Sequence, residues 1–494
     1  MKRFFLAAGV SFLTCVASAQ LPPELDAYLA DAQKRGNTPG LAIAVVKDGK
    51  VLAAKGYGVR ALGRPELVDA DTVFDTASLT KAFTAAAIAT LVDEGKMSWD
   101  DPVRRHLPQI EFADPYRTAN VTIRDLLAHR VGVEQANYVF RFTGHSTAEV
   151  LRRIRFMKER APFRTSMIYW NVGYAAAAEA AAAAAKEPFA DLVRKRLIEP
   201  LGMRDTTVAT DHVLAPNHAS SHATVGAVHR AVRTAKILSI AGANAVNSTA
   251  TDMAKWLLFS LGDGTWEGKR LISAEAMREM QSPQIVIPTT PEFRTARNLR
   301  YFAAYGLGWQ VFDFHGHRML WHSGSADGMP VYMCILPEDK IGVLVMTNSW
   351  EAGTLHGALA GRILETLLGL PLHDSATDPI EAHKRASAPA PEPVRIANTK
   401  PSRPLDSYAG TYVDTLHGDM VVKQAGTKLT MQFAGGELAD LDHWHHDVFR
   451  VRWQDRVNEW ADTFATFALD ATATPIRLEM RLPRDVVIEA VRPK

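Results

Sequence analysis

Three short motifs in this chain combine residue types that can carry out nucleophilic chemistry. The first is Ser78-x-x-Lys81, which leads into a helix-forming run over residues 82–94. Residues three apart lie on one face of a helix, so this spacing places the Ser78 hydroxyl beside the Lys81 amine. A serine needs a base to take its proton, and burial or a nearby cation lowers the pKa of a lysine toward that role. A helix that begins near Thr76 or Ala77 would place Ser78 in its first turn, where unpaired N–H groups favour negative charge.

The second motif is Tyr169-Trp170-Asn171, which precedes an alanine-rich helical run. A phenol near a cation loses its proton more easily than usual, so Tyr169 could share the role of base with Lys81 or replace it. The carbonyl and NH₂ groups of Asn171 could hold both Lys81 and a substrate amide. Taken alone, both motifs are also typical of a solvated helix face or a surface turn.

The third motif is Trp321-His322-Ser323-Gly324-Ser325, at the end of an expected strand. Gly324 would let a substrate approach the backbone closely, and an edge strand here could pair with an extended substrate. The backbone N–H groups of this strand could then stabilise an oxyanion. His322 adds a titratable donor near neutral pH, although a lone loop histidine is more often structural.

The elements that must position these motifs are strands near both ends of residues 20–375, with helices inserted between them. Hydrophobic alternation and turn residues predict a hairpin of residues 40–46 and 51–57, and later strands at 306–314, 319–322, 330–336 and 341–347. Helices are expected at 25–34 and 353–368. This order predicts an α+β fold in which helices flank an antiparallel sheet beside a helical subdomain.

Composition divides the rest of the chain. Residues 376–404 are rich in alanine, proline and charge, which predicts an extended linker. Residues 405–494 contain short alternating runs separated by glycine turns, which predict a small all-β domain, either a barrel or a sandwich.

The first 19 residues have the pattern of a secretory signal peptide: two basic residues, an apolar core and a small-residue site ending at Ala19. We therefore expect cleavage before Gln20 and a secreted or periplasmic protein, with lipidation of Cys15 as a minor alternative. Cys334 would then be the only cysteine, so no intramolecular disulfide is expected. No later apolar run reaches transmembrane length.

The charge pattern makes nucleic acid an unexpected partner, because the formal net charge is only +2 and no basic block is present. His443, His445, His446 and Asp447 could bind a metal, but their spacing is not that of a standard site. We interpret them as surface residues and expect neither a metal nor another cofactor.

The three motifs occur in the order Ser-x-x-Lys, Tyr-x-Asn, His-x-Gly, and in this order the chain resembles the serine β-lactamase and penicillin-binding-protein-like hydrolases. It is most similar to the branch that contains class C β-lactamases, D-aminopeptidases and esterases. Residues 122–133, 248–254 and 305–309 also match this family, and the likeness covers residues 25–370. A small β domain follows the hydrolase domain in many of these proteins.

The resemblance implies a role for each motif residue. Ser78 would be the acylated nucleophile, Lys81 and Tyr169 the proton-transfer pair, and Asn171 an orienting group. His322, Gly324 and Ser325 would contact the substrate, with the N–H groups of Ser78 and Ser325 forming the oxyanion hole.

The implied activity is hydrolysis of an amide, a lactam or an ester in a small molecule or peptide through an acyl-serine intermediate. β-Lactamase-like and D-amino-acid peptide hydrolysis are favoured, and an esterase is the next alternative. A covalent penicillin-binding sensor with negligible turnover is the rival from another class. His322 stands where many relatives have lysine, which replaces a permanent cation with one that depends on pH. The oligomeric state stays open.

Overall fold

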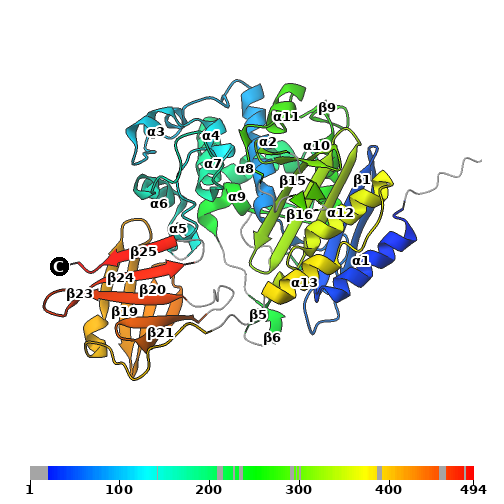
Figure 1. Cartoon of the computed structure of the whole chain (residues 1–494). Coiled ribbons are helices and arrows are strands. Elements are labelled where there is room, and N and C mark those ends of the chain that lie inside the picture. Colours follow the sequence, from blue (N-terminus) through cyan, green and yellow to red (C-terminus); the bar gives the residue numbers. More distant parts are fainter. Residues whose placement is uncertain are drawn as a thin grey trace, which may run out of the picture.

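The computed structural model describes residues 20–141, 143–208, 215–225, 228–232, 237–289, 294–295, 298–299, 302–386, 392–454, 463–482 and 486–493. The expected signal peptide, residues 1–19, lies outside these ranges. The described chain forms a sheet covered by helices, a helical region beside it and a separate barrel (Figure 1).

The central sheet has eight strands in the order β10-β13-β14-β15-β16-β17-β1-β2, and all neighbouring pairs are antiparallel. Their bounds are β1 Gly40–Lys47, β2 Lys50–Gly58, β10 Ile285–Val286, β13 Ala303–Tyr305, β14 Gln310–Phe314, β15 His317–Ala326, β16 Met329–Leu336 and β17 Ile341–Thr347. The N-terminal hairpin therefore completes a sheet whose other strands come from the end of the domain. This confirms the predicted α+β arrangement.

Both faces of the sheet are buried, as strand β1 shows. Leu41, Ile43 and Val45 pack in the cluster beneath α1 (Pro23–Arg35) and α12 (Leu355–Leu368). The alternate residues of β1 pack in the larger cluster that contains α2 (Thr80–Asp93) and α10 (Ala250–Leu261). Because side chains alternate across a strand, one continuous apolar run serves both cores.

The helical region lies beside the sheet and contributes much of the larger core. Its long helix α7 (Asn171–Ala185) contains the alanine tract, whose small side chains let α2 and α9 pack closely against it. The other helices are α3 Pro115–Asn120, α4 Ile123–Leu127, α5 Tyr138–Arg141, α6 Thr147–Arg152, α8 Phe189–Val193, α9 Ala241–Asn244 and α11 Ala274–Met280. Small antiparallel sheets join β3 Phe74–Asp75, β7 Val246–Ser248 and β4 Thr207–Val208; β5 His222–Val225 and β6 Val228–Ala231; β8 Thr265–Trp266 and β9 Lys269–Arg270; and β11 Arg294–Thr295 and β12 Asn298–Leu299.

The C-terminal region is a closed barrel of eight antiparallel strands, which decides between the two predicted β architectures. The strands are β18 Gly410–Asp414, β19 Gly418–Ala425, β20 Lys428–Phe433, β21 Leu438–His445, β22 Val448–Trp453, β23 Phe464–Leu469, β24 Pro475–Leu482 and β25 Val486–Val491. Each strand pairs with the next along the chain, and β25 closes onto β18. Closure leaves no free sheet edge in the barrel.

Two local predictions differ from the structure. The strand expected from Gly306 starts only at Gln310, because residues 306–309 form a turn in which Gly308 has φ +82°. The segment expected to be an extended linker contains helix α13, Thr377–Ala386. The side chains of Ala376 and Ile380 are buried in the core beneath α12. Two apolar residues change the composition of residues 376–404 too little for composition to have predicted this helix.

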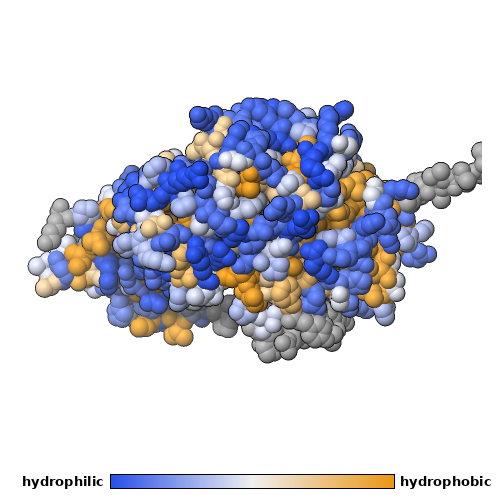
Figure 2. Space-filling view, turned by 90° about the horizontal axis from the view of Figure 1, so that it is seen from above, coloured by the Kyte–Doolittle hydropathy of each residue, from blue (hydrophilic) through white to orange (hydrophobic). Residues whose placement is uncertain are grey.

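The molecular surface in Figure 2 is mostly hydrophilic and is interrupted by groups of hydrophobic residues. In the described ranges, no helix has both the length and the apolar character needed to cross a bilayer.

Candidate active site

Ser78 lies in a 3-10 turn, Ala77–Leu79, that leads directly into α2. Ala77 has φ +46°, a conformation that side-chain-bearing residues rarely adopt, and its N–H donates to Asp75 Oδ1 at 2.7 Å. Thr80 fixes the other side of the turn by donating to the Ala77 carbonyl and accepting from the Val246 N–H. The predicted helix start near Ser78 is thus a strained turn anchored by two side chains.

Lys81 is completely buried, and its Nζ lies 3.0 Å from Ser78 Oγ. Burial holds the pKa of Lys81 well below its ordinary value, which favours the neutral amine. Nζ also lies 2.8 Å from Asn171 Oδ1 and 3.2 Å from the Ala243 carbonyl, both of which accept hydrogen bonds. A neutral amine that donates its two hydrogens to these oxygens directs its lone pair at the Ser78 hydroxyl. This is the geometry required of a base.

Tyr169 reaches the same serine: its hydroxyl donates to Ser78 Oγ at 2.8 Å. The expectation that a nearby cation would acidify this phenol is wrong, because burial raises the pKa of Tyr169 far above its ordinary value. Lys81 Nζ lies 4.7 Å from the centre of the Tyr169 ring, over its π face. At neutral pH Tyr169 therefore keeps its proton and is the hydrogen-bond donor to Ser78 Oγ.

His129 supports the segment that carries Tyr169. Its Nδ1 accepts the Trp170 N–H at 3.0 Å, and its carbonyl accepts the Ile168 N–H at 2.9 Å. The His129 ring packs 4.5 Å from the Tyr169 ring and 4.7 Å from the Tyr305 ring. Burial lowers the pKa of His129 well below its usual range, so the ring is a neutral packing group.

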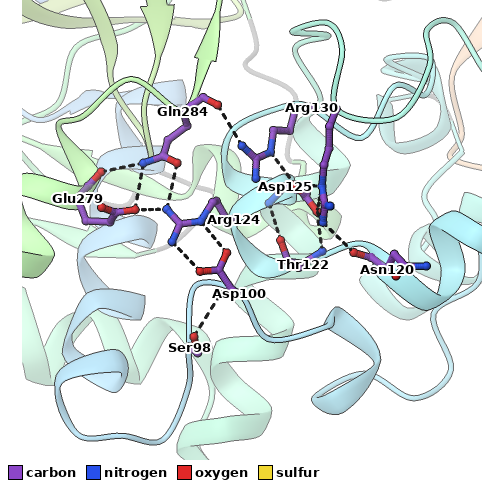
Figure 3. A network of polar contacts seen from close by, with 10 residues as sticks. Ser98, Asp100, Asn120, Thr122, Arg124, Asp125, Arg130, Glu279 and Gln284 are labelled. Atoms are coloured by element: carbon purple, nitrogen blue, oxygen red, sulfur yellow. Dashed lines mark hydrogen bonds and ion pairs between the residues drawn. The ribbon is translucent and has the colours of Figure 1, made fainter.

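A buried carboxylate holds the loop that contains His129 (Figure 3). Asp125 accepts from the Thr122 N–H in a capping box and from Arg130 Nε at 2.6 Å. Arg164 adds an ion pair to the same carboxylate at 2.7 Å. Burial alone would raise the pKa of Asp125, but the hydrogen bonds from Arg164, Thr122 and Arg130 outweigh it and hold the pKa below its usual value. The arginines thus tie this loop to its surroundings through one ionised group.

Strand β15 brings the third motif against the serine turn. A Cβ atom at Gly324 would lie 2.4 Å from the Thr76 carbonyl oxygen and 3.2 Å from Ala77 Cβ, so only glycine fits this close approach. β15 is not an edge strand as expected, since it lies between β14 and β16. Its pairing with β14 nevertheless ends at Trp321, whereas its pairing with β16 continues to Ala326. The segment that carries the motif therefore extends beyond β14.

His322 is buried, and its environment makes it neutral. Nδ1 lies 2.6 Å from the Ser323 carbonyl and must donate to it, while Nε2 accepts from the Tyr305 hydroxyl at 2.9 Å. Burial and the nearby Lys81 lower the pKa of His322 to about 3. The expected titration of His322 near neutral pH is therefore wrong.

A cavity of about 840 Å³ opens beside Ser78. All the predicted site residues except Lys81 border it; Lys81 lies beneath Ser78 and reaches it through Nζ. The remaining wall is aromatic and amide-rich and is formed by Ala77, Asn137, Tyr138, Phe140, Arg141, Ile237, Ile240, Asn244, Gln310, Ser323, Asp327 and Trp350. Arg141 forms an ion pair with Asp327 and so links α5 to the turn between β15 and β16.

Several residues of the site carry no sequence signal that would have identified them. Asn137 accepts from Asn171 Nδ2 at 3.2 Å, and Ala243 contributes only a backbone carbonyl. Tyr305 lies in a stretch that matches the family, but spacing alone does not connect it to His322. Only the tertiary fold brings these groups to the serine.

His443, His445, His446 and Asp447 lie where β21 and β22 join, and none of them borders the cavity beside Ser78. There Asp447 accepts hydrogen bonds from the Ser402 N–H and from the Ser402 and Tyr408 hydroxyls. Within the described ranges, no three His, Cys, Asp or Glu side chains are grouped to hold a metal ion.

Comparison with known proteins places both regions of the chain. Residues 25–368 match the family model described as Beta-lactamase, and residues 394–490 match a Domain of unknown function (DUF3471). The unguisins hydrolase ungD of Aspergillus violaceofuscus is 29% identical over 455 residues, which cover 83% of this chain and 78% of the relative. Penicillin-binding protein 4 of Amycolatopsis lactamdurans is 26% identical over 385 residues, which cover 76% of this chain and 93% of the relative.

Among solved structures, the octameric penicillin-binding protein homologue from Pyrococcus abyssi matches with a TM-score of 0.62 at 21% identity. The match covers 95% of this chain and 99% of that one. At this identity the likeness shows a shared fold, which extends through the barrel.

Proposed function

Since this chain belongs to the beta-lactamase family, we propose that it is an exported serine hydrolase that forms an acyl intermediate on Ser78. The observation that carries the proposal is the convergence of two groups on one oxygen. Lys81 Nζ lies 3.0 Å and the Tyr169 hydroxyl 2.8 Å from Ser78 Oγ. One of these groups is placed to accept a proton and the other to donate one.

In the acylation step, Ser78 Oγ attacks the substrate carbonyl carbon while its proton passes to Lys81 Nζ. The N–H groups of Ser78 and Ser325 stabilise the oxyanion. When the carbonyl reforms, the bond to the leaving group breaks, and the leaving nitrogen or oxygen takes the Tyr169 proton. The phenolate and the lysine ammonium that remain are opposite charges close together, which offsets the cost of ionising a buried tyrosine.

In the deacylation step, the Tyr169 phenolate takes a proton from water, and the hydroxide attacks the acyl carbon. The bond to Ser78 Oγ then breaks, and Oγ recovers the proton held by Lys81. The cycle consumes one water and returns both side chains to their starting states. It needs no metal and no separate carboxylate base.

The substrate class that fits best is a peptide, including one that contains D-amino acids, with esters next. A neutral His322 offers no positive charge to the carboxylate beside a β-lactam ring, so we place lactams after peptides. The large cavity with its amide-rich wall also suits a peptide backbone. The relative named unguisins hydrolase supports a hydrolytic reaction.

The test is to assay mature protein with a D-alanyl peptide, a p-nitrophenyl ester and a chromogenic cephalosporin, using Ser78→Ala as the control. We expect turnover of the peptide or the ester that falls by at least about a thousandfold in Ser78→Ala. Equal rates for the two proteins on every substrate would overturn the serine mechanism.

A second variant tests the assigned proton donor. Tyr169→Phe is expected to slow turnover by about 10²–10³ and to accumulate acyl-enzyme, which intact-protein mass spectrometry detects. A stoichiometric burst without turnover in the wild type would instead identify a covalent sensor. Detection of the precursor and mature forms in separated cell fractions tests the proposed export and the cleavage after Ala19.

A further inference from the structure

Helix α5 belongs to two hydrophobic cores at once. Val139 and Phe140 pack in the main core of the hydrolase domain. Tyr138, between Asn137 and Val139 in sequence, is 6% exposed and packs in the core of the C-terminal barrel. Among the described residues, Tyr138 is the only member of that barrel core that comes from the hydrolase domain. Figure 1 shows α5 where the helical region meets the barrel.

The exchange of side chains between the two domains is reciprocal. Leu416, from the turn between β18 and β19, packs in the core of the hydrolase domain. Arg153 donates to the carbonyls of Thr415 and Leu416 at 2.7 and 3.2 Å. A Cβ atom at Gly144 would lie 2.9 Å from Gly435 Cα, so the backbones of the two domains also meet here. The barrel is therefore fixed to the segment that follows α5.

The same helix borders the catalytic cavity. Asn137, Phe140 and Arg141 line it together with Tyr138. Asn137 Oδ1 accepts from Asn171 Nδ2 at 3.2 Å, and Asn171 Oδ1 accepts from Lys81 Nζ at 2.8 Å. A continuous chain of contacts thus connects the barrel core to the base beside the nucleophile.

We propose that the C-terminal barrel is a positioning element of the hydrolase site, which acts by holding the Tyr138 side chain in its hydrophobic core. This inference rests on the proposed function of Ser78 and Lys81. Anchoring Tyr138 fixes Asn137, and Asn137 keeps the Asn171 amide turned so that its carbonyl faces Lys81. That orientation leaves the lysine lone pair for Ser78. Tyr138 is a positioning residue, because it acts on the reacting groups through Asn137 and Asn171.

The test compares two truncations in the barrel core of the full chain. Tyr138→Ala removes the side chain by which α5 packs in the barrel core, whereas Leu429→Ala removes a buried side chain beside the turn between β19 and β20. Successive turns of this barrel alternate between its ends, so that turn lies at the end opposite the β18–β19 turn. We expect Tyr138→Ala to lower kcat/KM by about tenfold through kcat and Leu429→Ala to change it less than about twofold. Tyr138→Phe keeps the ring and should restore most of the activity.

A double mutant tests the route. Asn137→Ala is expected to lower kcat/KM by about tenfold, and adding Tyr138→Ala should lower it little further, because both act on one orientation. A combined loss near a hundredfold would overturn the route through Asn137. If Tyr138→Ala and Leu429→Ala have the same Tm and lose kcat/KM equally, the barrel only stabilises the fold. That result would overturn the proposal.

Hydrogen exchange separates this inference from the proposed function. Tyr138→Ala should speed amide exchange in peptides covering residues 134–141 and 169–175, whereas Leu429→Ala should not. If the wild type shows neither turnover nor acylation, the proposed function fails, and the exchange measurement still decides the coupling. Unchanged exchange in Tyr138→Ala would overturn the coupling, whatever the activity.

Discussion

The side-chain carbonyl of Asn171 accepts a hydrogen bond from Lys81 Nζ at 2.8 Å, inside a site where the lysine has no exposure to solvent. An ammonium there would lose its hydration, and the hydrogen-bond partners described for it are neutral oxygens, those of Ser78, Asn171 and Ala243. The rings of Tyr169 and Tyr174 lie 4.7 and 5.3 Å from Nζ and are also uncharged. The physical result is a lysine whose pKa is lowered rather than one held as a cation.

Replacing Lys81 with arginine tests this protonation state. A guanidinium stays protonated throughout the working pH range, so Lys81→Arg should lower kcat/KM by about 10²–10⁴. Lys96→Arg, at an exposed salt bridge with Glu94, is the matched control and should keep wild-type rates. In the wild type, kcat/KM should rise as Lys81 loses its proton, at a pH well below 10.5. An active Lys81→Arg enzyme would show that another group is the base.

The neutral state assigned to His322 predicts a pH profile that does not depend on this residue. With its pKa near 3, His322 stays neutral from pH 5 to 8. His322→Gln should lower kcat/KM by a roughly constant factor of about ten across this range, because it loses the contact with Tyr305. Parallel profiles of log kcat/KM against pH check this. The exposed His315 supplies the control variant His315→Gln. A change of slope in the profile of log kcat/KM near pH 6.5 that disappears in His322→Gln but not in His315→Gln would contradict the neutral state assigned to His322.

The order and spacing of Ser78, Tyr169 and His322 predicted three separate segments of the chain that the fold brings to one cavity. The N-terminal hairpin, the late strands and the β character of the C-terminal region also followed from alternation and turn residues. These features depend on hydrophobic alternation and turn residues, which are local patterns visible in the sequence itself.

The protonation states could not be predicted in the same way, because they depend on burial. Tyr169 keeps its proton and His322 stays neutral only because other segments enclose them. Asn137 and Tyr138 lie in a stretch without clear periodicity, so their contacts with Asn171 and the barrel core become visible only in the folded chain.

Asp75 should make the stability of the protein depend on pH. Burial and the nearby Asp327 raise its pKa to about 7, whereas the Ala77 N–H lowers it less than burial raises it. The unfolded chain releases this proton near pH 4, so between about pH 4 and 7 the native state binds more protons and stability falls as pH rises. Asp75→Asn keeps an acceptor for Ala77 and removes the charge. We expect its Tm advantage over wild type to grow from pH 5 to pH 8, and an advantage that shrinks over this range would contradict the raised pKa.

Asp125 should contribute strongly to stability even though it lies outside the reacting groups. Its carboxylate is completely buried and pairs with Arg164. It also binds Arg130 and the Thr122 N–H (Figure 3). Asp125→Ala leaves these donors without their acceptor, which costs about 3 kcal/mol in the free energy of unfolding. Asp100→Ala in the same network removes an exposed carboxylate that pairs with Arg124 and should cost less than about 1 kcal/mol.

The pH dependence distinguishes this ion pair from simple loss of packing. The pKa of Asp125 is lower in the native state than in the unfolded chain, where it is near 4. The ionised carboxylate therefore contributes fully to the free energy of unfolding above about pH 4, and this contribution disappears as the pH falls through the native pKa. The difference in unfolding free energy between wild type and Asp125→Ala, measured in urea, should therefore shrink below pH 4. Because this loop holds His129 against Tyr169, kcat should also fall in Asp125→Ala at neutral pH. A difference that stayed constant down to pH 3 would assign the stabilisation to packing and not to the charge.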